Sequence, residues 1–154
     1  MIHEVKVPLA WQWIEKVRET VNDVLRAHPE ELRQDAVMVA SELAENLVKY
    51  GQAMGGEDSG RIAIETNDGF VSITSENGAT PEGAQKVQEL VNAMTAAENV
   101  QMLYLERLTQ MADIPGDSAS ELGLLRIAFE GGFSLTCEYA APRLRLTAKR
   151  SLSG

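Results

Sequence analysis

The chain has 154 residues, a length that fits one domain, and 44% of them are hydrophobic, which is enough to form a packed core. Its formal net charge of −9 disfavours nucleic acid and anionic membranes as partners, because their phosphates would be repelled. The lone cysteine, Cys137, rules out an intrachain disulfide and a cysteine metal site, and His3 and His28 lack a ligand spacing.

Targeting and membrane-spanning signals are not recognisable in the sequence. Residues 1–15 place Glu4, Lys6 and Glu15 among short apolar pieces, unlike a signal peptide. No apolar run is long enough to cross a bilayer. We therefore expect a cytoplasmic protein that folds as a single domain over 1–154 and whose partners are proteins or small molecules.

The first half of the chain predicts one strand and two helices. Residues 2–7 alternate apolar and polar side chains, as a short edge strand does. Apolar positions at a helical period predict a helix over 10–27 and a second over 30–50, which Gly51 ends. Residues 52–60 are small and polar, and we expect a loop there.

The second half predicts two strand pairs separated by helices. An Asp-Gly turn between 61–66 and 70–75 is typical of a β-hairpin. The later predictions, in order, are a helix from Pro81, a helix over 100–111, a loop over 113–120, a helix over 119–130, and strands over 133–139 and 144–148. This order predicts an α+β, two-layer sandwich with a mixed, mostly antiparallel sheet covered by helices.

The segment from Ser41 to Gly51 holds the most informative polar residues. Glu42, Asn46 and Lys49 are spaced by four and three, which places them on one face of the second helix. An Asn carbonyl is a hard ligand that suits Mg²⁺, and a Glu one turn earlier can orient a hydroxyl for attack on a phosphoryl group. The same spacing also fits a solvated helix face with a Glu45–Lys49 pair, so both interpretations stay open.

The pattern Glu-Leu-x-x-Asn-x-x-x-Tyr-Gly over 42–51 resembles the N-box of the GHKL superfamily, especially of its anti-sigma-factor serine kinases. The resemblance implies a Bergerat, or histidine-kinase-like ATPase, fold with ATP and Mg²⁺ as cofactors. It also implies that Glu42 is the general base, that Asn46 binds Mg²⁺ and that Lys49 belongs to the nucleotide site. The element order resembles the family over most of the chain, but this is its one sharp motif.

The glycine motifs of that family are only partly kept. Where the family has Asp-x-Gly-x-Gly, this chain has Glu76-Asn-Gly78-Ala-Thr80, so Glu76 would have to recognise adenine in place of the Asp. The glutamate is one methylene longer, and the second glycine, which would permit close backbone approach to a ligand, is lost. The alternative is that Asn77-Gly78 is merely a turn.

The second glycine motif, Gly-x-Gly at a helix start, keeps only Gly123, where backbone N–H groups would hold phosphates. Glu121 replaces the first glycine, and Ser118-Ala-Ser-Glu121 also spells a helix capping box, which is the interpretation we favour. Between Gly78 and Gly123, the region of the family's ATP lid, Lys86 and Arg107 are the only basic residues. Such an acidic segment suits a triphosphate poorly.

Two functions follow from the resemblance. The first is a degenerate regulatory signalling domain that binds a partner protein, with weak or lost ATP binding. The second is an active Mg-ATP-dependent kinase that phosphorylates a serine of a small antagonist protein. The resemblance also allows a homodimer. A third interpretation, an unrelated structural α+β domain, would make the match over 42–51 a coincidence.

Overall fold

Five strands and five helices make up the described part of the chain, which in this computed structural model comprises residues 2–8, 13–50, 59–67, 69–111 and 119–152. In chain order they are β1 (Ile2–Pro8), α1 (Trp13–Val24), α2 (Glu30–Tyr50), β2 (Ser59–Thr66), β3 (Phe70–Gly78), α3 (Pro81–Ala96), α4 (Val100–Met111), α5 (Ala119–Phe129), β4 (Ser134–Ala140) and β5 (Arg143–Ser151). No helix among these residues is long and apolar enough to span a membrane.

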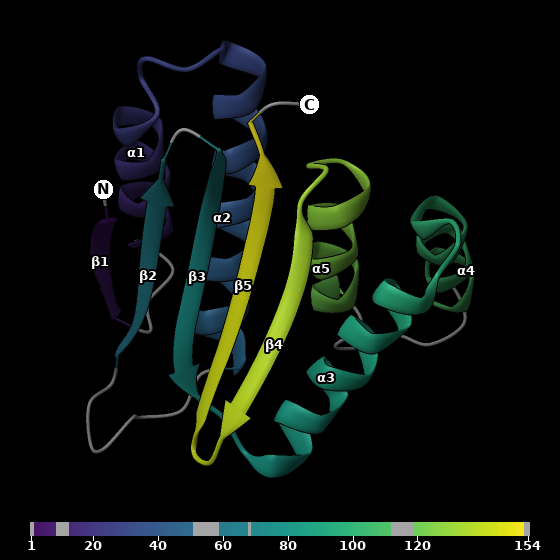
Figure 1. The fold of residues 1–154 in the computed structure, drawn as a ribbon. Helices are drawn as coiled ribbons and strands as arrows, with labels where there is room; N and C mark the ends of the chain where they lie inside the picture. Colours follow the sequence, from purple (N-terminus) through teal and green to yellow (C-terminus); the bar gives the residue numbers. More distant parts are fainter. Residues whose placement is uncertain (1, 9–12, 51–58, 68, 112–118, 153–154) are drawn as a thin grey trace.

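The strands form one sheet in the order β1-β2-β3-β5-β4, and every neighbouring pair is antiparallel. β5 lies between β3 and β4, so the last strand of the chain joins the two hairpins. Figure 1 shows α1, α2 and α5 on one side of this sheet, with α3 and α4 beyond the β4 edge. The α+β prediction is confirmed, and the sheet is antiparallel throughout rather than mixed.

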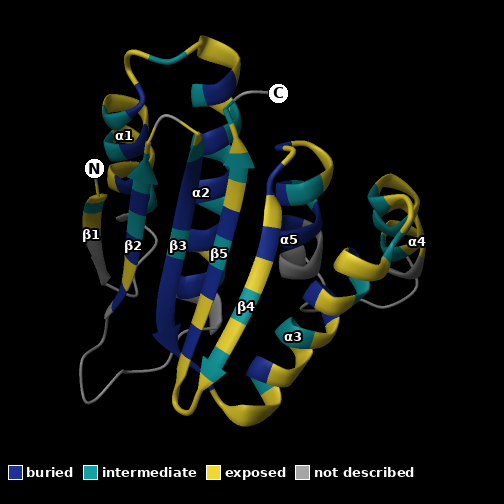
Figure 2. Cartoon of the chain, in the orientation of Figure 1, coloured by how far each residue is buried: buried dark blue, intermediate teal, exposed yellow. Residues whose placement is uncertain are grey.

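Strand alternation decides which face of the sheet is buried. Ile62 and Ile64 of β2 and Val71 and Ile73 of β3 are at most 2% exposed and pack in one core cluster with the apolar stripe of α2. Figure 2 shows this burial as dark blue along β3 and on the side of α2 that faces it. The predicted periodicity of α2 therefore describes its buried face correctly.

The opposite face of the sheet carries no helix among the described residues and is polar. It presents the intervening positions of β3 and β5, which pair across the sheet as Ser72 with Lys149, Thr74 with Thr147 and Glu76 with Arg145. The Thr74 and Thr147 hydroxyls lie 3.4 Å apart. This face lies toward the viewer in Figures 1 and 2, where β4 and β5 show exposed positions.

A glycine pair turns the chain from α5 into β4. Gly132 has a φ of +69°, a left-handed conformation that glycine adopts without steric cost. The N–H of Phe133 then donates to the carbonyl of Ile127 at 3.2 Å, which satisfies the end of α5. Nη1 of Arg150 on β5 donates to Asp35 of α2 at 2.7 Å and to the Gly131 carbonyl at 3.0 Å, so it ties this turn to the rest of the fold.

The predicted boundaries differ from the structure at several ends. β2 begins at Ser59, within the predicted loop, and α1 is described from Trp13. The rest of the predicted loop at 52–58 and the predicted loop at 113–118 lie outside the described residues. β3 continues to Gly78, three residues beyond its predicted end, and this extension changes the position of Glu76.

Candidate functional site

The side chain of Glu42 lies where α2 meets α5. The adjacent Leu43 and Leu47 are at most 1% exposed, so the core holds α2 in place and with it the position of Glu42. Only 14% of the Glu42 side chain is exposed, and its Oε1 accepts a hydrogen bond from Nη1 of Arg126 at 2.9 Å. The carboxylate predicted as general base is therefore one half of an ion pair between two helices.

Gly123 lies directly against this carboxylate. A Cβ atom built on Gly123 would clash with Oε2 of Glu42. The missing side chain at Gly123 thus makes room for the carboxylate and lets α5 approach α2. The sequence placed Gly123 in a phosphate cradle, but here the space beside it holds a negative charge, which would repel a phosphate.

We expect Gly123→Ala to stabilise the protein only where Glu42 is absent. Alanine is about 1 kcal/mol better than glycine inside a helix, so the substitution should stabilise a Glu42→Ala background. In the wild type the new methyl displaces the carboxylate and disturbs its pairing with Arg126, so we expect no gain or a loss. Urea denaturation should be measured for the wild type, the two single variants and the double variant. We expect a coupling free energy of about 1 kcal/mol between the two substitutions, and additive effects would contradict the contact.

Arg126 lies between two carboxylates. Its Nε donates to Oε2 of Glu130, one turn later on α5, at 3.0 Å, while Nη1 holds Glu42. Burial raises the pKa of the Glu42 carboxyl above its ordinary value, and the Glu45 carboxylate raises it further. Arg126 opposes this shift, and Glu130 adds a smaller increase. Glu42 is therefore a carboxylate whose ionisation is disfavoured by its surroundings.

The raised pKa of Glu42 predicts a pH dependence of stability. Between the ordinary carboxyl pKa and the raised one, the folded state binds more protons at Glu42 than the unfolded state does. The contribution of Glu42 to the free energy of unfolding is therefore largest below pH 4.5, and it is lost as the pH rises through the raised pKa. Urea midpoints of wild type and Glu42→Gln over this range should show the wild type losing stability relative to the variant, and parallel curves would contradict the shift.

A groove of about 520 Å³ opens beside Glu42, between α1, α2 and α5. Val37 and Met38 of α2 give it an apolar part, and Glu42 and Arg126 line it on the α5 side. The other lining residues are Glu15, Arg18, Glu19, Asn22, Gln34 and Ser41. This mixture of both charges with apolar surface suits a segment of another protein better than a polyphosphate, which requires a cationic lining.

Asn46 and Lys49 follow Glu42 along α2. Asn46 is half-buried and lies one turn after Glu42, on the same side of the helix. The side chain of Lys49 lies outside the described part of the structure, as does that of Glu121. The structure therefore places Glu42, Asn46 and Gly123 in one region and does not describe how Lys49 contributes to it.

Glu76 lies on the other face of the sheet. Because β3 continues through it, Glu76 pairs in register with Arg61 and Arg145, while the neighbouring Ser75 pairs with the buried Leu146. Nε of Arg145 donates to Oε1 of Glu76 at 2.7 Å, and Nη2 of Arg143 lies 3.2 Å from Oε2. Both carboxylate oxygens of Glu76 are thus held by arginines of β5. Its predicted partner Gly78 is the buried last residue of β3.

The residues expected to hold Mg-ATP therefore do not meet in one site. The helical side of the sheet carries Glu42, Asn46 and Gly123, and the opposite face carries Glu76. Glu42 is paired with Arg126, and no cluster of metal-ligating side chains occurs among the described residues. The described side chains as arranged do not fit Mg-ATP, because the predicted base is paired with Arg126 and the predicted adenine-binding carboxylate lies on the other face of the sheet.

Sequence reasoning missed three arginines that define these two clusters. Arg126 of α5 is the cation that holds Glu42. Arg143 and Arg145 flank the buried Leu144, and this alternation is the signal that puts both arginines on the polar face of a strand. Their partner Glu76 could be found only by knowing that β5 pairs with β3.

Comparison with known proteins supports the fold. No protein-family model matches the chain, and no curated protein matches it significantly. Among solved structures, the chain is similar to the crystal structure of the SiaB-SiaC complex from Pseudomonas aeruginosa, with a TM-score of 0.71 and 19% sequence identity. The match covers 97% of this chain and 89% of that chain, so the two share their fold over nearly their whole lengths.

These findings contradict the assignment to the GHKL superfamily. No model of that or any other family matches, and the similar structure is a SiaB-SiaC complex. The motif over 42–51 misled because Glu42 and Asn46 do share one side of a helix, as they would in an N-box, but Glu42 pairs with Arg126. The Bergerat fold that the resemblance implied is therefore not supported, while the α+β architecture is.

Proposed function

We propose that this chain is a regulator in a bacterial signalling system and acts by binding a partner protein. The observation that carries the proposal is the similarity, over 97% of the chain, to a protein solved as part of a protein–protein complex, SiaB-SiaC. At 19% identity this likeness concerns the fold alone, so the transfer of a partner-binding role is our inference.

The chemistry of the described residues supports a binding role over a catalytic one. A partner-binding protein needs a shaped surface, and the groove between α1, α2 and α5 offers apolar and charged groups of both signs. A phosphoryl-transfer enzyme needs cations around the phosphates and an available base, whereas Glu42 is held by Arg126 and backed by Gly123. The alternative, a Mg-ATP-dependent serine kinase, would require Glu42 to leave this pair.

Titration with Mg-ATP separates the two functions. A ligand at a thousand times its Kd stabilises a protein by about 4 kcal/mol, which a melting curve detects easily. We expect millimolar Mg-ATP to leave the melting temperature unchanged. A rise in melting temperature that Asn46→Ala abolishes would support the kinase and overturn our proposal.

Partner binding is tested directly by purifying the tagged chain from the cells that naturally produce it. We expect a second protein in a fixed molar ratio, which rebinds when both proteins are purified separately and mixed. Size-exclusion chromatography with light scattering measures the ratio. A chain that elutes alone from every preparation and binds no protein on reconstitution would contradict the proposed function.

A further inference from the structure

Exposed apolar side chains are concentrated on one helix, α4. The large hydrophobic residues that are exposed in the described structure are Ile2, Met102, Leu105, Leu108 and Phe129. Three of these five belong to α4, with exposed fractions of 54% for Met102, 47% for Leu105 and 39% for Leu108. Scattered exposed apolar residues are ordinary, but a cluster on one element indicates an interaction surface.

The geometry of α4 explains how it exposes one apolar side while using another for packing. Leu103 and Tyr104 are partly buried against the core, and the Tyr104 ring lies 5.2 Å from the ring of Phe129 on α5. Met102 and Leu105 are three residues apart and lie on a different side of the helix, while Leu108, four residues after Tyr104, borders the packed side. α4 packs on the rest of the described structure mainly through α5, and Met102 and Leu105 stay about half exposed on this second side.

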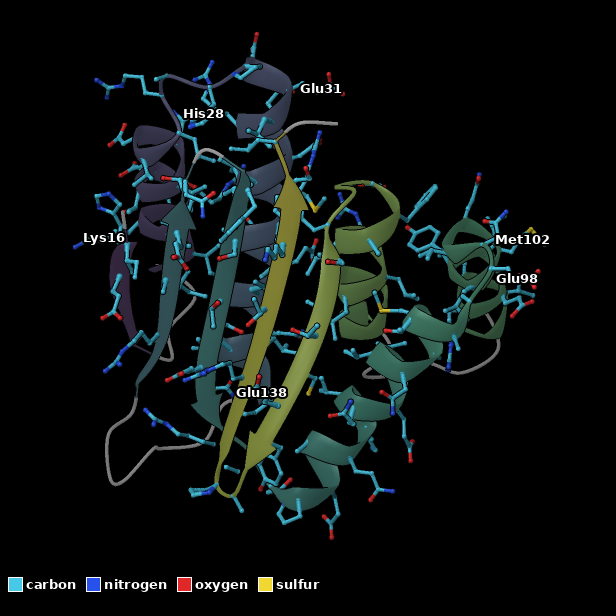
Figure 3. All side chains as sticks on the ribbon, viewed as in Figure 1. Lys16, His28, Glu31, Glu98, Met102 and Glu138 are labelled. Atoms are coloured by element: carbon cyan, nitrogen blue, oxygen red, sulfur yellow. The ribbon has the colours of Figure 1, made fainter. Side chains whose placement is uncertain are left out.

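α4 lies at the outside of the molecule, with one side away from the sheet (Figure 1). Figure 1 shows α4 at the outside of the molecule, beyond α5 and the β4 edge, and Figure 2 shows much of it as exposed. In Figure 3, Met102 and Glu98 are labelled on α4 and just before it, on the side away from the sheet. Apolar and acidic side chains therefore share this outer surface.

The charges around the surface limit what can cover it. Glu98 and Glu106 are exposed and lie four residues before and four residues after Met102, and they give the apolar stripe an acidic rim. A symmetric dimer through this surface would bring the acidic rims of two copies together, each on a chain of net charge −9. A partner with basic side chains around an apolar groove is complementary instead.

We propose that the outer side of α4, formed by Met102 and Leu105 and bordered by Leu108, is the docking surface for a partner protein that offers an apolar groove with a basic rim. This inference rests on the proposed partner-binding function and names the surface that would perform it. An amphipathic helix that inserts its apolar side into a partner's groove is a recurring mode of recognition. The α4 stripe supplies the anchors, and its acidic rim supplies the attraction that orients the partner.

Site-specific photo-crosslinking in the native cells tests which surface is covered. A photoreactive amino acid is placed at Leu105, at Arg18 in the groove beside Glu42, and at Thr136 on the helix-free sheet face, each of which is exposed. We expect the Leu105 position alone to crosslink a second protein. A crosslink only from Arg18 or Thr136 would overturn the docking surface while leaving the partner-binding function intact, and no crosslink from any position would count against both.

Affinity measurements with the purified captured protein provide the second step. We expect Met102→Glu and Leu105→Glu each to weaken binding at least tenfold by calorimetry, while Ile2→Glu leaves it unchanged. Ile2 is the matched control because it is also a large exposed apolar residue, 63% exposed, but lies on β1 at the far edge of the sheet. Melting curves should show all three variants folded, since each site is exposed.

The rim is tested by charge reversal and salt. Glu106→Lys should weaken binding, and the wild-type affinity should fall as salt rises, because both changes reduce attraction to basic side chains. If Leu105 crosslinks instead to a second copy of this chain, the occupant is not a basic partner and the proposal is overturned. Unchanged affinity in both Met102→Glu and Leu105→Glu would overturn it as well.

Discussion

Replacing Phe133 with alanine should lower the free energy of unfolding by about 3–5 kcal/mol. Phe133 is 1% exposed and is among the largest fully buried side chains, so its removal leaves a cavity that the surrounding core cannot fill. It also lies immediately after the Gly131-Gly132 turn, where its N–H is bonded to Ile127. The loss would be a large fraction of the 5–15 kcal/mol that stabilises a typical domain.

Urea denaturation of wild type and Phe133→Ala measures this loss, and Phe70→Ala provides the control. Phe70 is only partly buried, and its ring is covered by the Lys149 ammonium at 4.0 Å from the ring centre. We expect the control to cost about 1 kcal/mol, since it loses a cation–π contact and little core volume. Equal losses in the two variants would mean that Phe133 does not fill the core as the structure shows.

The helices and strands were predictable because local periodicity determines them. The apolar stripe of α2 and the Asp-Gly hairpin of β2 and β3 both come from neighbouring residues, and both are present. The end of β3 was not predictable in this way, because Asn77-Gly78 has the composition of a turn. The strand continues because β5 pairs with it as far as Gly78, and this pairing joins residues far apart in the sequence.

The candidate site was predictable only in part, for the same reason. The spacing of Glu42 and Asn46 correctly indicated one side of α2. It did not reveal that Glu42 is paired with Arg126, which lies 84 residues later. Local sequence also does not indicate that Glu76 and Glu42 lie on opposite faces of the sheet, because that depends on strand register. One residue of register decides which face a strand side chain occupies.

A second prediction concerns Glu76. Removing its two arginine partners should lower the free energy of unfolding more than removing its own charge does. The Glu76 side chain is 12% exposed, whereas those of Arg143 and Arg145 are 55% and 50% exposed. Replacing both arginines with alanine removes both ion pairs of a buried carboxylate, and we expect a loss of about 2 kcal/mol. Glu76→Gln leaves two arginines that water can still solvate, so we expect a loss below about 1 kcal/mol.

Comparing the stability lost in the double arginine variant with that lost in Glu76→Gln distinguishes a structural carboxylate from one that serves a ligand. If Glu76 is a structural residue of the sheet, adding Glu76→Gln to the double arginine variant should restore part of the lost stability, because it removes a buried charge that has lost its two ion pairs. Urea denaturation of the wild type and the three variants measures this recovery. A further loss in the triple variant would contradict the arginine clamp and would show that the carboxylate has another stabilising partner. A recovery would explain, without any nucleotide, why a glutamate stands where the sequence suggested a residue that reads adenine.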